Sequence, residues 1–221
     1  MIERLIYWLF QTLFRMTGST LKLSHGQYYH IYNRGINSCN LFIETDNYEY
    51  FMHLYDKHIT DVAETFAWVL MPNHFHFVVR IKEESEINAV IKDPGLLKPP
   101  HQHFSNLFNA YTKAFNRRFN RHGALFERPF KRKSVEDRQY LKQLILYVHN
   151  NPVHHGFCSH TIEYPWSSYI TSISLKQTKL KRDEVVGWFD NVEGFIRSHN
   201  QDTKYLEIDN WLGLNSSETN Y

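Results

Sequence analysis

The hydrophobic pattern of this chain alternates between the period of a strand and that of a helix. Three short segments rich in aromatic and β-branched residues predict strands at residues 28–33, 65–71 and 74–81. The last two are separated only by Pro72 and Asn73, which predicts a tight turn between them.

Three longer segments have apolar residues at helical spacing. They cover residues 46–60, after an Asp46 cap, then 104–120, and then 137–151, where Pro152 is expected to close the helix. The order of these elements predicts an α+β fold with an antiparallel sheet and helices on one face.

The two ends of the chain differ from its middle. Residues 1–17 are an apolar extension of uncertain role, too short to span a bilayer and without a small-residue cleavage site. A packing helix and a misassigned start both remain open for it. Residues 18–175 are expected to form the main domain, and residues 176–221 a C-terminal helical and tail region.

Charge is distributed unevenly, although the formal net charge of the 221 residues is only +2. Between residues 113 and 133 the only acid is Glu127, and the basic residues are Lys113, Arg117, Arg118, Arg121, Arg128, Lys131, Arg132 and Lys133. Such a run indicates either a phosphate-binding surface or a solvated helix face. Aromatic residues make up 16%, which fits a core rich in rings or rings kept for stacking on bases.

The two cysteines, Cys39 and Cys158, have neither pairing nor metal-ligand spacing. This argues against a disulfide framework and a zinc ribbon. A reducing, cytoplasmic compartment fits.

The segment His74-Phe75-His76 carries the sharpest chemical signal. Residues two apart on a strand point to the same face, so two imidazoles would lie side by side as ligands for one metal ion. Two exposed histidines on a half-buried strand are the alternative. His101 and His103 have the same spacing but follow Pro99-Pro100 in a stretch expected to be irregular, so no metal site is predicted there.

The helix at 137–151 brings a second pair together. Tyr147 lies at the edge of its apolar stripe, and Asn151 lies four residues further on, beside it. A phenolate can attack phosphorus, and a divalent metal can polarise the phosphoryl oxygen. A core-edge tyrosine and a helix-ending asparagine are the alternative interpretation.

Taken together, these motifs resemble the REP-associated tyrosine transposases, a group of single-tyrosine HUH transposases. The HUH motif is matched by His74-Phe75-His76 after Met71-Pro72-Asn73, and the catalytic helix by Tyr147 to Pro152. Further matching segments are residues 29–35, 115–118, 125–131 and 164–169. In this view residues 88–103 are an insertion.

The resemblance implies a ferredoxin-like or RRM-like sheet and an HUH endonuclease. It implies Mg²⁺ or Mn²⁺ held by His74, His76 and Asn151, with catalysis by these histidines and Tyr147, which would form a 5′-phosphotyrosine. It implies transposition, in which single-stranded DNA is nicked and rejoined near palindromic hairpins by a monomer or homodimer in the nucleoid. The residues then expected to contact DNA are Asn33, Arg34, Asn116, Arg117, Arg118, Arg128, Lys131 and Arg132.

Two other functions remain open. A domesticated, non-catalytic nucleic-acid-binding protein would use the same sheet, aromatic residues and basic run. A metal hydrolase would use His74 and His76 with an activated water, and it would release products without a protein–DNA adduct.

Overall fold

The computed structural model describes residues 21–91, 93, 95, 97–201 and 208. Its centre is one four-stranded antiparallel sheet with the order β2-β3-β1-β4. The strands are β1 (Tyr28–Arg34), β2 (Ala63–Met71), β3 (His74–Ile81) and β4 (Lys131–Val135). The predicted α+β class with an antiparallel sheet is therefore confirmed.

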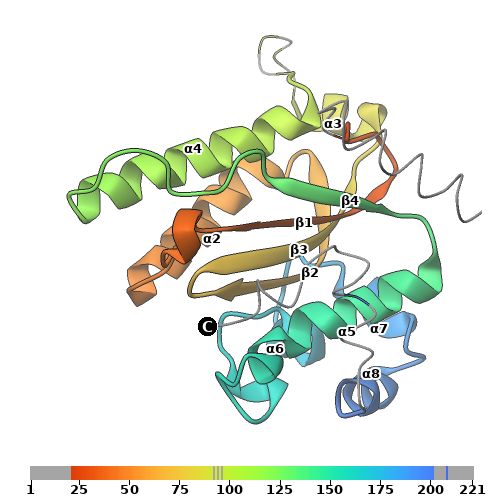
Figure 1. The fold of residues 1–221 in the computed structure, drawn as a ribbon. Helices are drawn as coiled ribbons and strands as arrows, with labels where there is room; N and C mark the ends of the chain where they lie inside the picture. Colours follow the sequence, from red (N-terminus) through yellow and green to blue (C-terminus); the bar gives the residue numbers. More distant parts are fainter. Residues whose placement is uncertain (1–20, 92, 94, 96, 202–207, 209–221) are drawn as a thin grey trace, which may run out of the picture.

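Two long helices, α2 (Thr45–Ile59) and α4 (Pro100–Arg118), cover one face of the sheet (Figure 1). Their apolar side chains pack against alternate residues of the strands, including Ile31, Phe75 and Phe77. The short α3 (Glu84–Val90) follows β3 and precedes α4.

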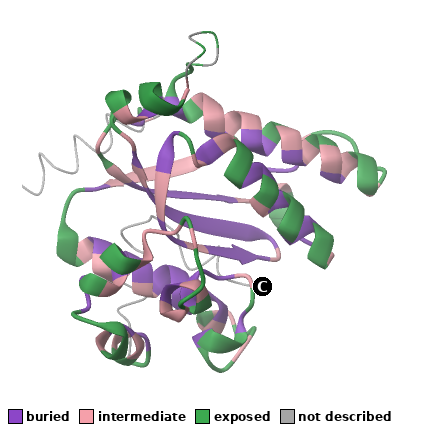
Figure 2. Cartoon of the chain, turned by 180° about the vertical axis from the view of Figure 1, so that it is seen from behind, coloured by how far each residue is buried: buried purple, intermediate pink, exposed green. Residues whose placement is uncertain are grey.

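The opposite face is covered as well, by α5 (Arg138–His154), α6 (Tyr169–Ile173), α7 (Arg182–Gly187) and α8 (Val192–His199) (Figure 1). The prediction had placed helices on one face only. In β2 and β3, side chains that point to either face of the sheet are buried, so these two strands need cover on both sides. Figure 2 shows these strands as buried ribbons between two helical layers.

Several helix boundaries differ from the expected ones. Helix α2 begins at Thr45 with Glu44 as its N-cap, so Asp46 lies in its first turn and is not the cap. Helix α4 begins at Pro100 rather than near residue 104, because proline is favoured in the first helical turn. His101 and His103 therefore lie on a helix, where residues two apart point in different directions. Pro152 lies inside α5, which continues to His154, so it does not close the helix.

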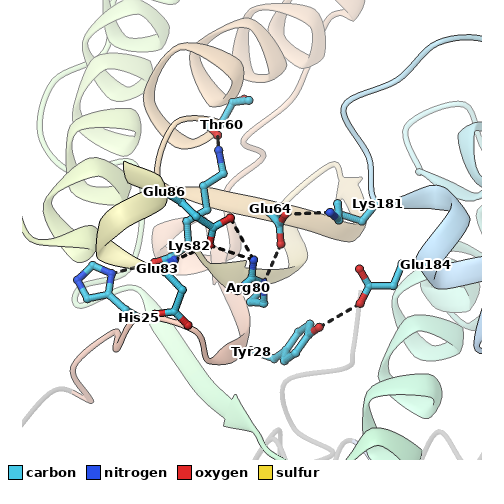
Figure 3. Close-up of polar contacts among 10 residues, drawn as sticks. All are labelled: His25, Tyr28, Thr60, Glu64, Arg80, Lys82, Glu83, Glu86, Lys181 and Glu184. Carbon is cyan, nitrogen blue, oxygen red and sulfur yellow. Dashed lines mark hydrogen bonds and ion pairs between the residues drawn. The ribbon is translucent and has the colours of Figure 1, made fainter. Parts of the chain in front are cut away.

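A polar network fixes the C-terminal segment to the far end of the sheet (Figure 3). The Glu64 carboxylate on β2 pairs with Arg80 of β3 at 2.7 Å and with Lys181 at 2.9 Å. The Tyr28 hydroxyl donates to Glu184 of α7 at 3.3 Å. Helix α7 is thus held to the strands by charge as well as by packing.

A chain of buried hydrogen bonds joins α5 to α8. His199 Nδ1 donates to the Phe195 carbonyl, so its Nε2 accepts from His149 Nδ1 at 2.9 Å. The Ser168 hydroxyl then donates to His149 Nε2 at 2.7 Å and accepts from the Trp68 backbone N–H. The single N–H of each neutral ring donates a hydrogen bond and the other ring nitrogen accepts one, so α8 stabilises the position of α5.

Within the described part of the chain, no helix is long and apolar enough to cross a bilayer. Cys39 and Cys158 are both free thiols. The predicted extension at residues 1–17 and most of the chain after residue 201 lie outside the described residues.

Candidate active site

His74 and His76 lie on the same face of β3, at the end where the strand begins. The intervening Phe75 points into the opposite core with Phe77. The two imidazole rings have centroids 5.1 Å apart and are nearly perpendicular. The strand alternation used in the prediction therefore gives the correct direction for both side chains.

Helix α5 places Tyr147 and Asn151 against these histidines within the same chain. Asn151 Oδ1 is 3.0 Å from His74 Nε2, and the Tyr147 ring lies 5.6 Å from the His76 ring at 89°. Tyr147 is only 1% exposed, and Asn151 is fully buried. The four residues predicted for chemistry thus meet at one buried place. Tyr147 and Asn151 are four residues apart on α5, and His74 and His76 are two apart on β3.

The surroundings of His74 suit a cation. Burial lowers the pKa of His74 to about 3, so the ring is neutral and has a single N–H. Its Nδ1 is 2.8 Å from Asn73 Oδ1 and its Nε2 is 3.0 Å from Asn151 Oδ1. One N–H can donate to only one of these two amides, so the other ring nitrogen presents its lone pair to an amide group. Neighbouring ligands of Mg²⁺, each about 2.1 Å from the ion, are also about 3 Å apart.

His76 is oriented by His30, a residue that sequence analysis had not assigned to the site. His76 Nδ1 lies 2.9 Å from His30 Nε2, which leaves His76 Nε2 available to a ligand. His30 is fully buried and stacks on Tyr32 at 4.6 Å. The alternation of β1 could have revealed it, because Tyr29 and Ile31 on either side belong to the opposite core.

The proposed ligands are two imidazoles and an amide. Among the residues that the structure describes, no group of three or more His, Cys, Asp or Glu side chains is arranged to hold a metal ion. His155 contributes a further imidazole close by, with its ring 5.4 Å from that of His74, and burial lowers its pKa to about 4.

The residues predicted to bind DNA fall into several groups. Asn33 and Arg34 end β1, where the Asn33 amide donates to the Glu127 carbonyl and Arg34 lies 3.6 Å from the Glu127 carboxylate. Lys131 also pairs with Glu127, at 3.7 Å. These contacts tie the end of β1 to the start of β4.

The other predicted DNA contacts lie on α4 and after it. The Asn116 amide donates to the Gly123 carbonyl, which gives it a structural role in the loop. Arg117 is exposed, and Arg118 pairs with Glu44 at 3.0 Å on the surface. Arg128 and Arg132 line a cavity beside α4.

Lys131 and Lys133 face the candidate site. In the sheet they lie opposite Tyr32 and His30, and directly paired residues point to the same face. Tyr32 in turn pairs with His76. Two cations therefore lie along the edge of the histidine face, and Lys133 is one that the DNA-contact prediction had omitted.

The free energy of unfolding is expected to fall as pH is lowered from about 7 to about 4 with a chelator present. Burial lowers the pKa of His30 and His74 to about 3 and that of His199 to about 4. These rings stay neutral when folded, but the unfolded chain takes up protons below about pH 6.5, so acid favours unfolding. Each extra proton changes stability by about 1.4 kcal/mol per pH unit.

Urea denaturation at a series of pH values measures this slope. A stability that stayed flat between about pH 7 and about pH 5 would mean that these imidazoles are not held neutral by the fold.

Comparisons with known proteins support the fold. No protein-family model and no curated protein matches the sequence. Among solved structures, this chain is similar to a REP-associated tyrosine transposase whose structure was solved bound to a REP hairpin. The TM-score is 0.56 at 17% sequence identity, over 70% of this chain and 84% of the other. The chain therefore shares the fold of that transposase.

Proposed function

We propose that this protein is a metal-dependent transposase or endonuclease that nicks and rejoins single-stranded DNA beside hairpins. The observation that carries the proposal is the meeting of Tyr147 and Asn151 of α5 with His74 and His76 of β3. The fold that it shares with a hairpin-bound transposase supports the same proposal.

In this proposal Tyr147 is the nucleophile. Its oxygen bonds to phosphorus as the bond from phosphorus to the 3′ oxygen breaks. The phenol proton passes to solvent, the departing 3′ oxygen gains a proton, and the 5′ phosphate stays on the tyrosine. Attack by a 3′ hydroxyl on this phosphotyrosine reverses the step and joins two DNA strands.

His74, His76 and Asn151 would hold Mg²⁺ or Mn²⁺, which when bound polarises a phosphoryl oxygen. Lys131 and Lys133, at the edge of the same face, would attract the DNA backbone. Because the Tyr147 ring is only 1% exposed, the side chains that cover it must move when DNA enters.

That burial also favours a second candidate, a hairpin-binding protein that does not cut. The test is incubation with Mn²⁺ and end-labelled single-stranded hairpins from around the gene, followed by a denaturing protein gel. The label is placed at the 3′ end, because the strand that stays on the tyrosine is the one on the 3′ side of the cut. Label that migrates with the protein supports the nicking enzyme. Cut DNA without an adduct indicates a hydrolase, and intact DNA that is still bound indicates the binding protein.

His30 is expected to act as a positioning residue for His76. His30→Phe keeps a ring in the buried site but removes the partner of His76 Nδ1. Loss of such a partner weakens metal affinity by about 10–100-fold. Mn²⁺ titration by electron paramagnetic resonance measures this, and His30→Gln should restore part of the affinity, because its amide oxygen can accept from Nδ1. Equal affinity in all three proteins would remove His30 from this role.

A further inference from the structure

A cavity of about 380 Å³ lies between α4 and the segment that leads into β4, on the face of the sheet opposite the histidines. Its volume falls in the range of small-ligand sites. Its lining comes from the end of β1, from one face of α4 and from residues 125–132.

We propose that this cavity binds one unpaired nucleotide of the DNA strand. The inference rests on the proposed DNA-nicking function and defines part of its substrate as single-stranded DNA with a base turned out of the stack.

The walls of the cavity suit a base. Phe108, Phe126 and Phe130 form a continuous aromatic group, with ring centroids 5.3 and 5.4 Å apart. Rings of this kind stack on any nucleobase. The exposed Asn109 adds an amide, the group that proteins use to hydrogen-bond the edges of unpaired bases.

Arg132 supplies an unused cation. Its guanidinium lies 4.5 Å from the centre of the Phe130 ring, and among the described residues its buried Nε and Nη1 have no hydrogen-bond partner. Burial also lowers the pKa of this guanidinium. Buried donors without partners are costly, and acceptor oxygens of a bound nucleotide would satisfy these two nitrogens.

The cavity lies close enough to the histidines to share a strand with them. Asn33, in its wall, is followed by Arg34, which pairs with His74 across the sheet. Strand β4 forms the edge of the sheet next to β1, and in it Lys131 and Lys133 face the histidine side while Arg132 faces the cavity. A DNA strand that passes round this edge would meet cations on both faces.

The test uses the Tyr147→Phe protein, which is not expected to cut, and a fluorescent DNA hairpin with a short tract of unpaired thymidines on its 5′ side. A single abasic site is moved through the tract, and affinity is measured by anisotropy. One abasic position is expected to weaken binding about tenfold, because a stacked base is lost, while the others change little.

Two further variants identify the cavity as the cause. Asn109→Trp should fill it and Arg132→Gln should remove its cation. Each is expected to weaken binding about tenfold and to abolish the sensitivity to that abasic position. Lys176→Gln, which removes an exposed charge beyond α6, is the matched control and should bind as the parent does.

The proposal would be overturned if an abasic site weakened binding equally at every position. It would also be overturned if both cavity variants bound the hairpin as tightly as the Tyr147→Phe parent, or if the parent did not bind DNA. The wild-type adduct assay separates this result from the proposed function. An adduct without a sensitive position rejects the cavity alone. A sensitive position that both variants abolish, without an adduct, supports the cavity and rejects nicking.

Discussion

Tyr147→Phe is expected to abolish both strand cleavage and the covalent protein–DNA adduct, with a loss of more than about 10⁴-fold in rate. The substitution removes only the hydroxyl from a ring that is already buried against His76 and His30. Its packing is retained, so the fold and hairpin affinity should change little. The measurement is a denaturing gel of the protein with 3′-end-labelled hairpin and Mn²⁺, together with anisotropy for binding.

Tyr140→Phe is the matched control, because Tyr140 lies on the same helix two turns earlier. It should cut and form the adduct as the wild type does. Cleavage by the Tyr147→Phe protein would show that the phenol is not the nucleophile, and a hydroxide held by the histidines would then be the better account. Loss of binding as well as cutting would indicate damage to the fold rather than to the chemistry.

The geometry around β3 could be predicted from sequence because it depends only on local periodicity. A strand turns alternate side chains to opposite faces, so His74 and His76 had to lie together once the strand was recognised. Helical spacing in the same way placed Tyr147 beside Asn151. The contact between these two pairs depends on the tertiary structure. For this contact the prediction relied on the family resemblance and not on the local pattern.

What the sequence analysis missed depends on contacts between distant segments. The partnership of His30 with His76 requires β1 to pair with β3 in one register, and a shift of one residue would turn His30 to the other core. The second helical layer was missed because buried strands with apolar residues on both faces look like any short apolar run. The series of hydrogen bonds from Ser168 through His149 to His199 likewise joins residues that are far apart in sequence.

The second helical layer has a consequence for the proposed chemistry. Tyr147 and Asn151 lie on α5, which packs on β2 and β3 and is joined to α8 through His149 and His199. The proposed nucleophile lies on a helix that is held from both sides, so it keeps a fixed distance to the proposed ligands on β3. Rigid support of this kind lowers the cost of orienting reactive groups.

His74→Ala is expected to abolish measurable Mn²⁺ binding, with a loss of more than about 100-fold in affinity. Removing a ligand should cost more than removing a residue that only orients one, for which the loss is about 10–100-fold. The His74 imidazole lies 3.0 Å from Asn151 Oδ1. Its removal would take away one of the two neighbouring groups proposed to hold the metal. His76→Ala should have the same effect, since its Nε2 is the ring nitrogen not used by His30.

His101→Ala provides the matched control, because His101 belongs to the other His-x-His segment but lies exposed on α4. It should bind Mn²⁺ as the wild type does. Both active-site variants leave a cavity in a buried region, so their circular dichroism and melting temperatures must be compared with those of the wild type. If a folded His74→Ala protein bound Mn²⁺ with undiminished affinity, the cation would have to be held elsewhere. Tyr147 would then need another source of charge stabilisation for attack on phosphorus.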